Sequence, residues 1–147
     1  MKLYVAYGSN LNLEQMARRC PDATIVAKGV VEDYALKYRG SKTGAYATII
    51  KEKGKKVPVL VWNISPADES KLDVYEGFPT FYYKKTVLVR LENGRKIRAM
   101  AYIMFDEALP GVPSNYYMRT IYDGYIANGL DLNILFESFD DNDEECC

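Results

Sequence analysis

A single glutamate, Glu76, stands in the most aromatic part of the sequence. It precedes Gly77 at the expected end of a helix, and its neighbours include Tyr75, Phe78 and the run Phe81-Tyr82-Tyr83. A carboxylate packed among aromatic rings loses hydration, so its charged form is disfavoured and its pKa rises toward neutrality. Such a group can accept and return a proton. The pattern leaves open a second interpretation, in which the acid ends a helix in solvent and the aromatic residues only pack.

The second candidate site is the turn Tyr7-Gly8-Ser9-Asn10, which directly follows the strand-like run Lys2-Leu3-Tyr4-Val5-Ala6. Gly8 lets a ligand approach the backbone, and Ser9, Asn10 or Asn12 can cap the helix expected behind the turn. N–H groups near a helix start attract carboxylates and developing oxyanions. The turn therefore either binds an anionic group or simply joins a strand to a helix.

The sequence contains no histidine. Within these residues this excludes histidine-dependent triads, histidine general bases and histidine-ligated zinc. Ser9 lacks a base partner, so we interpret it as a cap or hydrogen-bonding residue and not as a nucleophile. Cys20, Cys146 and Cys147 have neither disulfide-framework nor zinc spacing. We expect Cys20 in the core, assign no function to the other two, and expect no metal or cofactor.

The charge balance is nearly even, with 19 basic and 20 acidic residues among 147. This balance gives no sign of a nucleic-acid-binding surface. No apolar run approaches the roughly 20 residues of a membrane span, and the first residues do not resemble a secretion signal. We therefore expect a cytoplasmic protein that binds neither nucleic acid nor membrane. A homodimer is left open.

Hydrophobic patterning predicts mostly strands in the first two thirds of the chain. Gly29 is expected at a bulge or bend, Lys51–Lys56 in a solvated turn, and Asn93-Gly94 at the turn of a hairpin. The predicted strands cover residues 2–6, 24–28, 30–31, 34–38, 46–50, 57–63, 82–92 and 95–105.

Helices are predicted behind the first turn, after Ser65, after Ser114, and at residues 132–139. Ser65-Pro66-Ala67-Asp68 combines an N-cap, a proline at the first helical position and an acid three residues beyond the cap. Asn128-Gly129 closes the third helix. The elements predict an α+β fold with a mixed sheet and leave open whether that sheet closes into a barrel. We expect one domain over residues 1–139 and a disordered acidic tail over residues 140–147.

Two motifs in this order, Tyr7-Gly8-Ser9-Asn10 and Leu72-Asp73-x-x-Glu76-Gly77, resemble the γ-glutamylcyclotransferase family. The resemblance covers most of the chain, because it extends to Tyr46-Ala47-Thr48-Ile49, Val61-Trp62, Pro113-Ser114-x-Tyr116 and Asn128-Gly129-Leu130. It implies a small mixed β-barrel flanked by helices. Members of the family release 5-oxoproline from a γ-glutamyl amide, when the α-amine of the glutamyl group attacks its own side-chain carbonyl and expels an amine.

By this resemblance Glu76 is the general acid and base. The backbone of Tyr7, Gly8, Ser9 and Asn10 would hold the glutamyl group of a small-molecule substrate, and Tyr83 would contribute a hydroxyl. The resemblance leaves the leaving amine open. Two alternatives remain: a module that binds a small ligand or a protein without catalysis, and a hydrolase in which Glu76 activates water.

Overall fold

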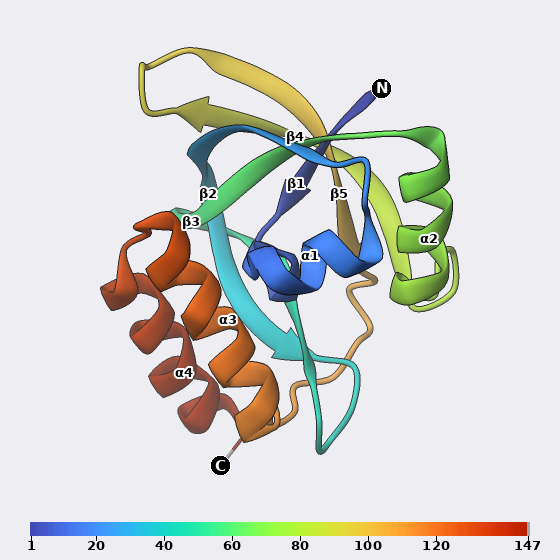
Figure 1. Cartoon of the computed structure of the whole chain (residues 1–147). Helices are drawn as coiled ribbons and strands as arrows, with labels where there is room; N and C mark the ends of the chain where they lie inside the picture. The colour runs from blue at the N-terminus through green and yellow to red at the C-terminus, as the bar shows by residue number, and fades with distance from the viewer. Residues whose placement is uncertain (147) are drawn as a thin grey trace.

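In the computed structural model, which describes residues 1–146, five strands form a closed barrel and four α-helices lie outside it (Figure 1). The strands are β1 Lys2–Ala6, β2 Thr24–Arg39, β3 Tyr46–Ile64, β4 Tyr82–Leu91 and β5 Lys96–Met104. The α-helices are α1 Leu13–Arg19, α2 Pro66–Glu76, α3 Asn115–Asn128 and α4 Leu132–Cys146, and a 3-10 turn, η1, spans Ser9–Leu11.

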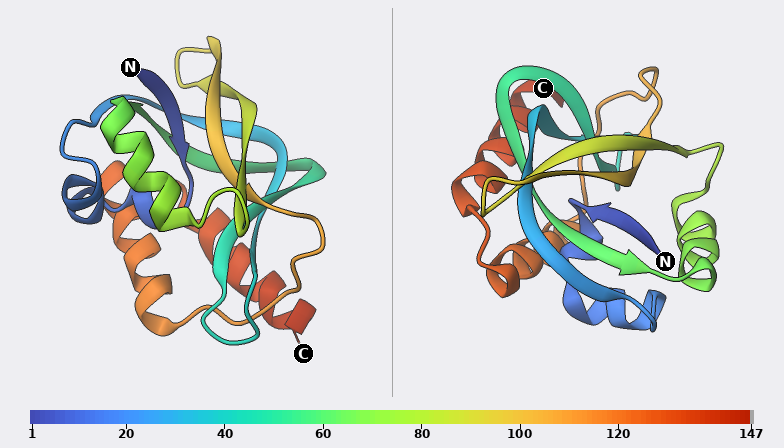
Figure 2. Two further views of the ribbon diagram at one scale, coloured as in Figure 1. Left: turned by 90° about the vertical axis from the view of Figure 1, so that its right-hand side faces the viewer. Right: turned by 90° about the horizontal axis from the view of Figure 1, so that it is seen from above.

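The strand order around the barrel is β1-β3-β2-β4-β5. Neighbouring strands pair antiparallel, except that β1 meets β5 in parallel at Tyr4 and Met100, which closes the barrel. Helices α3 and α4 lie side by side against one flank, and α2 lies on the opposite flank (Figures 1 and 2). The prediction of an α+β fold with a small mixed barrel flanked by helices is confirmed.

Strand β2 is continuous where the sequence predicted separate strands. Its irregularities fall between Ile25 and Ala27 and beside Asp33, which has a φ of 60°. Of the two expectations for Gly29, a bulge or a bend, the bulge is therefore wrong, because Gly29 pairs with Val59 in regular register. A Cβ at Gly29 would lie 2.6 Å from the carbonyl oxygen of Arg90, so the glycine is needed because β4 approaches closely there. Likewise Lys51–Lys56 is largely exposed to solvent, as predicted, but belongs to β3.

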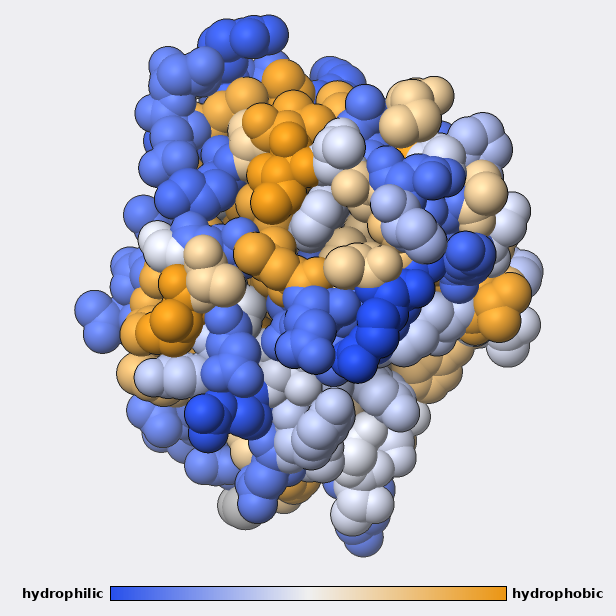
Figure 3. Space-filling view, viewed as in Figure 1, coloured by the Kyte–Doolittle hydropathy of each residue, from blue (hydrophilic) through white to orange (hydrophobic). Residues whose placement is uncertain are grey.

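The local signals for the Asn93-Gly94 hairpin and for the helix caps are confirmed. Strands β4 and β5 form the hairpin, and the residues at its tip, 92–95, are exposed. Figure 3 shows hydrophilic residues at the upper left, where Figure 1 places this tip, beside a patch of hydrophobic residues that covers barrel strands. Ser65 and Asp68 form a complete capping box at the start of α2, and Gly77 ends that helix with a φ of 64°.

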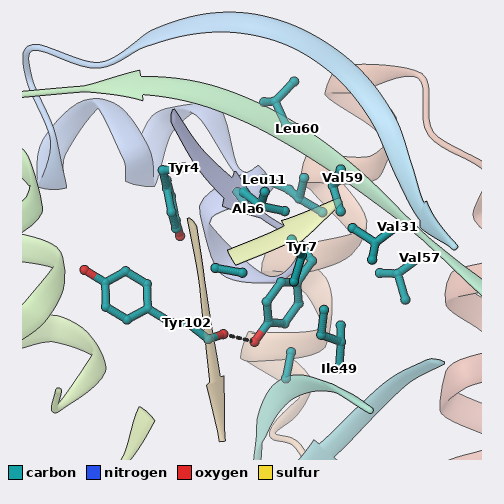
Figure 4. Packing of buried hydrophobic residues seen from close by; sticks show 14 of the residues in the cluster. Tyr4, Ala6, Tyr7, Leu11, Val31, Ile49, Val57, Val59, Leu60 and Tyr102 are labelled. Atoms are coloured by element: carbon teal, nitrogen blue, oxygen red, sulfur yellow. Dashed lines mark hydrogen bonds between the residues drawn. The ribbon is translucent and has the colours of Figure 1, made fainter. Parts of the chain in front are cut away.

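The barrel interior and the space under the helices form one hydrophobic core (Figure 4). Cys20 lies in this core, as predicted, and is 1% exposed. Helix α3 packs on the turn after β1, where a Cβ at Gly124 would lie 2.7 Å from the carbonyl carbon of Leu11. Asn128 also donates a hydrogen bond to the Leu11 carbonyl, 2.8 Å away. The turn is therefore held from outside the barrel by α3.

The expectation of a disordered tail is wrong for residues 140–146, which continue α4. Asn142 is 3% exposed, and its Nδ2 donates to the Gly111 carbonyl at 3.0 Å. Glu145 pairs with Arg39 at 2.9 Å and with Lys37. The tail was predicted from its net charge, whereas its order depends on basic residues far away in the sequence. Cys147 lies outside the described residues.

The ordered tail can be tested with Asn142→Ala. The variant removes the hydrogen bond to Gly111, so we expect the free energy of unfolding to fall by about 1 kcal/mol in urea denaturation. Asp143→Ala, an exposed neighbour on the same helix, is the control and should change nothing. Equal stability of the two variants would mean that the tail does not pack.

Candidate active site

A cavity of about 380 Å³ opens where the end of β1, the C-terminal end of α2, the start of β3 and α3 come together. Glu76 and the turn Tyr7-Gly8-Ser9-Asn10 both line it. The two motifs, far apart in the sequence, thus face the same space. The rest of the wall is mainly aromatic, and its aromatic members are Tyr4, Tyr7, Tyr46, Tyr75, Phe81, Tyr82, Tyr102 and Tyr117.

The turn presents backbone to the cavity because Gly8 has no side chain. A Cβ there would lie 3.1 Å from the Cβ of Ala47 across the cavity wall. After Gly8 the chain enters η1, and Asn12 caps α1 by accepting a hydrogen bond from the Gln15 N–H at 3.0 Å. The first N–H groups of a helical turn have no acceptor within the turn. They are therefore available to an anionic group in the cavity.

Arg19, at the end of α1, ties this turn to α2. Its guanidinium donates to the side-chain oxygen of Asn10, lies 3.5 Å from the Ser9 hydroxyl, and stacks 3.6 Å above the ring centre of Tyr75. The Ser9 and Tyr75 hydroxyl oxygens are 3.2 Å apart. Asn10 in turn donates to the Tyr4 hydroxyl at 2.9 Å. These contacts fix the orientation of Ser9 and Asn10.

Glu76 is the last residue of α2 and is partly buried in the aromatic cavity. Loss of hydration raises the pKa of its carboxyl group to about 7, and the nearby Arg19 charge opposes part of that rise. The carboxylate charge in turn raises the pKa values of several cavity tyrosines, Tyr4, Tyr7, Tyr82 and Tyr117, although burial is the larger cause. The carboxyl group can therefore exchange a proton near neutral pH.

The position of α2, and with it that of Glu76, is set by polar contacts with the barrel. Lys84 on β4 binds Asp73 at 2.9 Å and Glu69 at 2.8 Å, both on α2. The Tyr102 hydroxyl of β5 donates to Asp73 at 2.6 Å. The side chains of Lys84, Glu69 and Asp73 are each less than one third exposed. Their contacts therefore fix the position of α2 relative to the cavity.

Two tyrosines hold the backbone of Ala47, which packs next to Gly8. The Tyr82 hydroxyl donates to the Ala47 carbonyl at 2.6 Å, and the Ala47 N–H donates to the Tyr117 hydroxyl at 3.0 Å. Burial raises the pKa of both phenols well above the usual value. Both therefore remain protonated at neutral pH and act as neutral hydrogen-bonding groups.

The structure brings together five of the six predicted site residues: Tyr7, Gly8, Ser9, Asn10 and Glu76. It does not bring Tyr83 to the cavity. Side chains alternate along a strand, so Tyr82 faces the cavity and Tyr83 packs outside against Phe105, with ring centres 4.9 Å apart.

Sequence reasoning missed Arg19 and most of the tyrosine wall. The spacing of Gln15 and Arg19, four residues apart on one helix, was the available signal for a pair, and Arg19 does donate to Gln15 at 2.6 Å. Nothing local indicated that Arg19 also reaches Tyr75. Within residues 1–146 there is no group of three or more acidic, cysteine or histidine side chains arranged to hold a metal ion.

A closed barrel thus holds a partly buried carboxyl group in the same aromatic cavity as a Gly-Ser-Asn turn, and comparisons with known proteins identify the class of enzyme that has this fold. The family model described as gamma-glutamyl cyclotransferase, AIG2-like, matches residues 4–119. The chain therefore belongs to this family. The predictions of the family, of its barrel fold and of a γ-glutamylcyclotransferase-type enzyme are confirmed.

Individual relatives cover most of the chain. It is 34% identical over 139 residues to the gamma-glutamylcyclotransferases of Bos taurus and Homo sapiens, which covers 88% of this chain and 73% of each relative. A solved structure of a gamma-glutamyl cyclotransferase superimposes with a TM-score of 0.83 at 30% identity, over 93% of this chain and 85% of that one.

The influence of Arg19 on Glu76 can be tested with Arg19→Met. Removing the positive charge should raise the pKa of the Glu76 carboxyl group above 7, since the charge stabilises the ionised form. The pKa is measured from the pH titration of the ¹³C-labelled carboxyl signal by NMR. Arg18→Met, which removes an exposed arginine next in the chain, is the control. An unchanged midpoint in Arg19→Met would show that the two groups do not interact.

Proposed function

We propose that this chain releases 5-oxoproline and a free amine from γ-glutamyl amides, with Glu76 as the general acid and base. The α-nitrogen of the glutamyl group attacks its own γ-carbonyl carbon, the new C–N bond closes a five-membered ring, and the original amide C–N bond breaks. Glu76 accepts the proton that the α-nitrogen loses and gives it to the departing nitrogen. The observation that carries the proposal is the carboxyl group with a pKa of about 7 in the same cavity as the turn.

The attacking and attacked groups belong to one molecule, so the protein has mainly to hold a reactive conformation and stabilise the charge that develops. The turn Tyr7-Gly8-Ser9-Asn10 is suited to both tasks, because its backbone N–H groups can hold an anionic oxygen. The packing of Gly8 against Ala47 and the contacts of Arg19 keep this backbone rigid. A rigid donor array stabilises a developing oxyanion without first reorganising.

The tyrosine wall supports the chemistry by excluding water. Eight aromatic side chains surround the cavity, and Tyr82 and Tyr117 use their hydroxyls to hold Ala47. A cavity of about 380 Å³ matches a small ligand such as a glutamyl group. The poorly hydrated environment also keeps the Glu76 pKa near neutrality, which is where a group that must both accept and donate a proton is most effective.

The setting of the reaction belongs to the same proposal. The substrate is a small γ-glutamyl compound, and we place the protein in the cytoplasm as one domain over residues 1–139 to which the end of α4 is packed. Among the helices of residues 1–146, none is long and apolar enough to cross a membrane.

The primary test compares the wild type with Glu76→Gln on a panel of γ-glutamyl dipeptides, γ-glutamyl amines and glutathione. We expect 5-oxoproline from the wild type, detected by mass spectrometry, and a loss of about 10³-fold in kcat/KM in the variant. Glu14→Gln, an exposed glutamate on α1, is the matched control. Free glutamate as product would indicate a hydrolase, and binding without any product would indicate a binding module.

Misfolding is not expected to explain a loss of activity in Glu76→Gln. The folded protein holds the Glu76 proton up to about pH 7, whereas an unfolded carboxyl group loses it near 4.5. Burial of Glu76 therefore lowers stability progressively as the pH rises from 4.5 to 7. At pH 8 the neutral variant should be at least as stable as the wild type in urea.

The pH dependence gives an independent test. Glu76 must be ionised to accept the proton, so kcat/KM should fall about tenfold per pH unit below an apparent pKa near 7. An ordinary glutamate would place this limb near 4.5. The control is the profile of Arg19→Met, whose limb should move to higher pH, while a limb caused by ionisation of the substrate would stay in place. A flat profile between pH 5 and 7 would contradict the assignment.

A further inference from the structure

A second concave surface lies beside the catalytic cavity. This groove has a volume of about 910 Å³ and runs between the loop at residues 40–43, the loop at residues 105–112 and the end of α4. Its floor includes Phe81, Met104 and Phe105. Phe81 also belongs to the aromatic wall of the catalytic cavity, whereas Met104 and Phe105 take no part in the chemistry proposed above. The groove adjoins the reacting centre, so an inference about its ligand rests on the proposed function.

The groove and the catalytic cavity share a wall. Phe81 lines both, and its ring contacts Tyr46 of the cavity, with ring centres 6.0 Å apart. The Phe81 N–H donates to the Gly77 carbonyl at 2.8 Å, so a single turn of chain joins this ring to Glu76. Both Phe81 and Tyr46 are more than one third exposed. A group bonded to the nitrogen beside Glu76 can therefore extend over these two rings into the groove.

The part of the cavity wall formed by Ser9 and Tyr75 is obstructed. Tyr75 lies there with its hydroxyl against Ser9, and the Arg19 guanidinium covers its ring at 3.6 Å. These three side chains join α1, α2 and the turn after β1. A leaving group that pointed this way would have to break the contacts that orient the turn.

The surface of the groove is mainly apolar although it faces solvent, and Lys42, Glu107 and Glu145 are its charged lining residues. Leu109 is 76% exposed, Val112 47% and Phe105 44%. The charge of Glu145 at the rim is balanced by Arg39 and Lys37. Apolar side chains in a concave surface gain free energy when a ligand removes them from water. The groove therefore favours a ligand with an apolar body.

The two loops are held in place before any ligand arrives. Backbone hydrogen bonds join Gly40 to Leu109 and Lys42 to Val112, each at 3.0 Å. A Cβ at Gly111 would overlap the carbonyl oxygen of Ser41, so the loops are in direct backbone contact. Asn142 of α4 holds Gly111 from the other side. A rigid groove loses little entropy on binding and can distinguish ligands by shape.

From these features we infer that the groove is the subsite for the leaving group, and that the preferred γ-glutamyl amides carry an extended leaving group with an apolar body. The glutamyl part occupies the cavity, the amide nitrogen lies beside Glu76, and the remainder crosses Phe81 into the groove. Leu109 and Val112 are then specificity-determining residues.

The test measures kcat/KM for γ-glutamyl-alanine, γ-glutamyl-phenylalanine and γ-glutamyl-phenylalanyl-leucine. The expected order rises with the apolar area of the leaving group, by at least about tenfold from the first to the last. In Leu109→Ser the advantage of the last substrate should shrink at least about threefold, with γ-glutamyl-alanine unaffected. Leu88→Ser, an exposed leucine on β4 outside both concave surfaces, is the matched control.

Binding of the same three compounds to Glu76→Gln by calorimetry separates the two proposals. Product from all three substrates at equal kcat/KM would overturn the groove inference and leave the proposed function standing. A second outcome is that no product forms, while affinity rises with leaving-group size and falls in the double variant with Leu109→Ser. This outcome would overturn the proposed function and support the inference that the groove binds the apolar group. Affinity independent of size would overturn the inference in either case.

Discussion

A carboxyl group held in a poorly hydrated place is the constraint on which the rest of this structure depends. An ionised Glu76 is destabilising where it lies, and its pKa of about 7 is the measure of that effect. The helix that carries it must therefore be fixed by other contacts. Lys84 supplies them by joining Asp73 and Glu69 to the barrel, and Tyr102 adds a hydrogen bond from the neighbouring strand. The stabilising contacts of Asp73 and Glu69 thus lie about one and two helical turns before Glu76, the residue that lowers stability.

The same logic applies to the turn that faces Glu76. A backbone that offers N–H groups to a ligand cannot use them in secondary structure, so it has to be held by packing. Gly124 lets α3 approach this backbone from outside, and Asn128 binds the Leu11 carbonyl. Arg19 supports it from the side. The turn is rigid because two separate helices, α3 and α1, contact it.

How far the sequence predicts this arrangement depends on the range of the interactions. The capping box at Ser65 and Asp68 and the hairpin at Asn93-Gly94 are local, and both were predictable. The location of the cavity was also predictable, because the two motifs of the family resemblance contain Glu76 and the turn Tyr7-Gly8-Ser9-Asn10. The sequence did not predict which of the neighbouring residues Tyr82 and Tyr83 faces the cavity, because both stand in the same aromatic run. The register of β4 with β5 decides that Tyr82 faces the cavity.

Longer-range contacts were beyond prediction for a physical reason. The end of α4 is acidic, and acidic segments without partners stay disordered. Its partners, Arg39 and Lys37, are about a hundred residues earlier on β2 and become neighbours only after the barrel has closed. The continuity of β2 and β3 was beyond prediction for the same reason. Their charged middle sections stay in the sheet because the two strands pair with each other on both sides of those sections.

The cavity and the groove place different demands on the fold, and the structure separates them accordingly. The reacting group is the same in every γ-glutamyl amide, and the residues around it lie mainly on the turn after β1, the end of α2, the start of β3 and α3, which are fixed to the core. The leaving group varies from one substrate to another, and the groove is built from two loops and a helix end. Loops change at little cost to a core they do not enter. On this reasoning, substitutions at 40–43 and 105–112 alter which amide is used while leaving ring closure intact, because among residues 1–146 Phe81 alone lines both spaces.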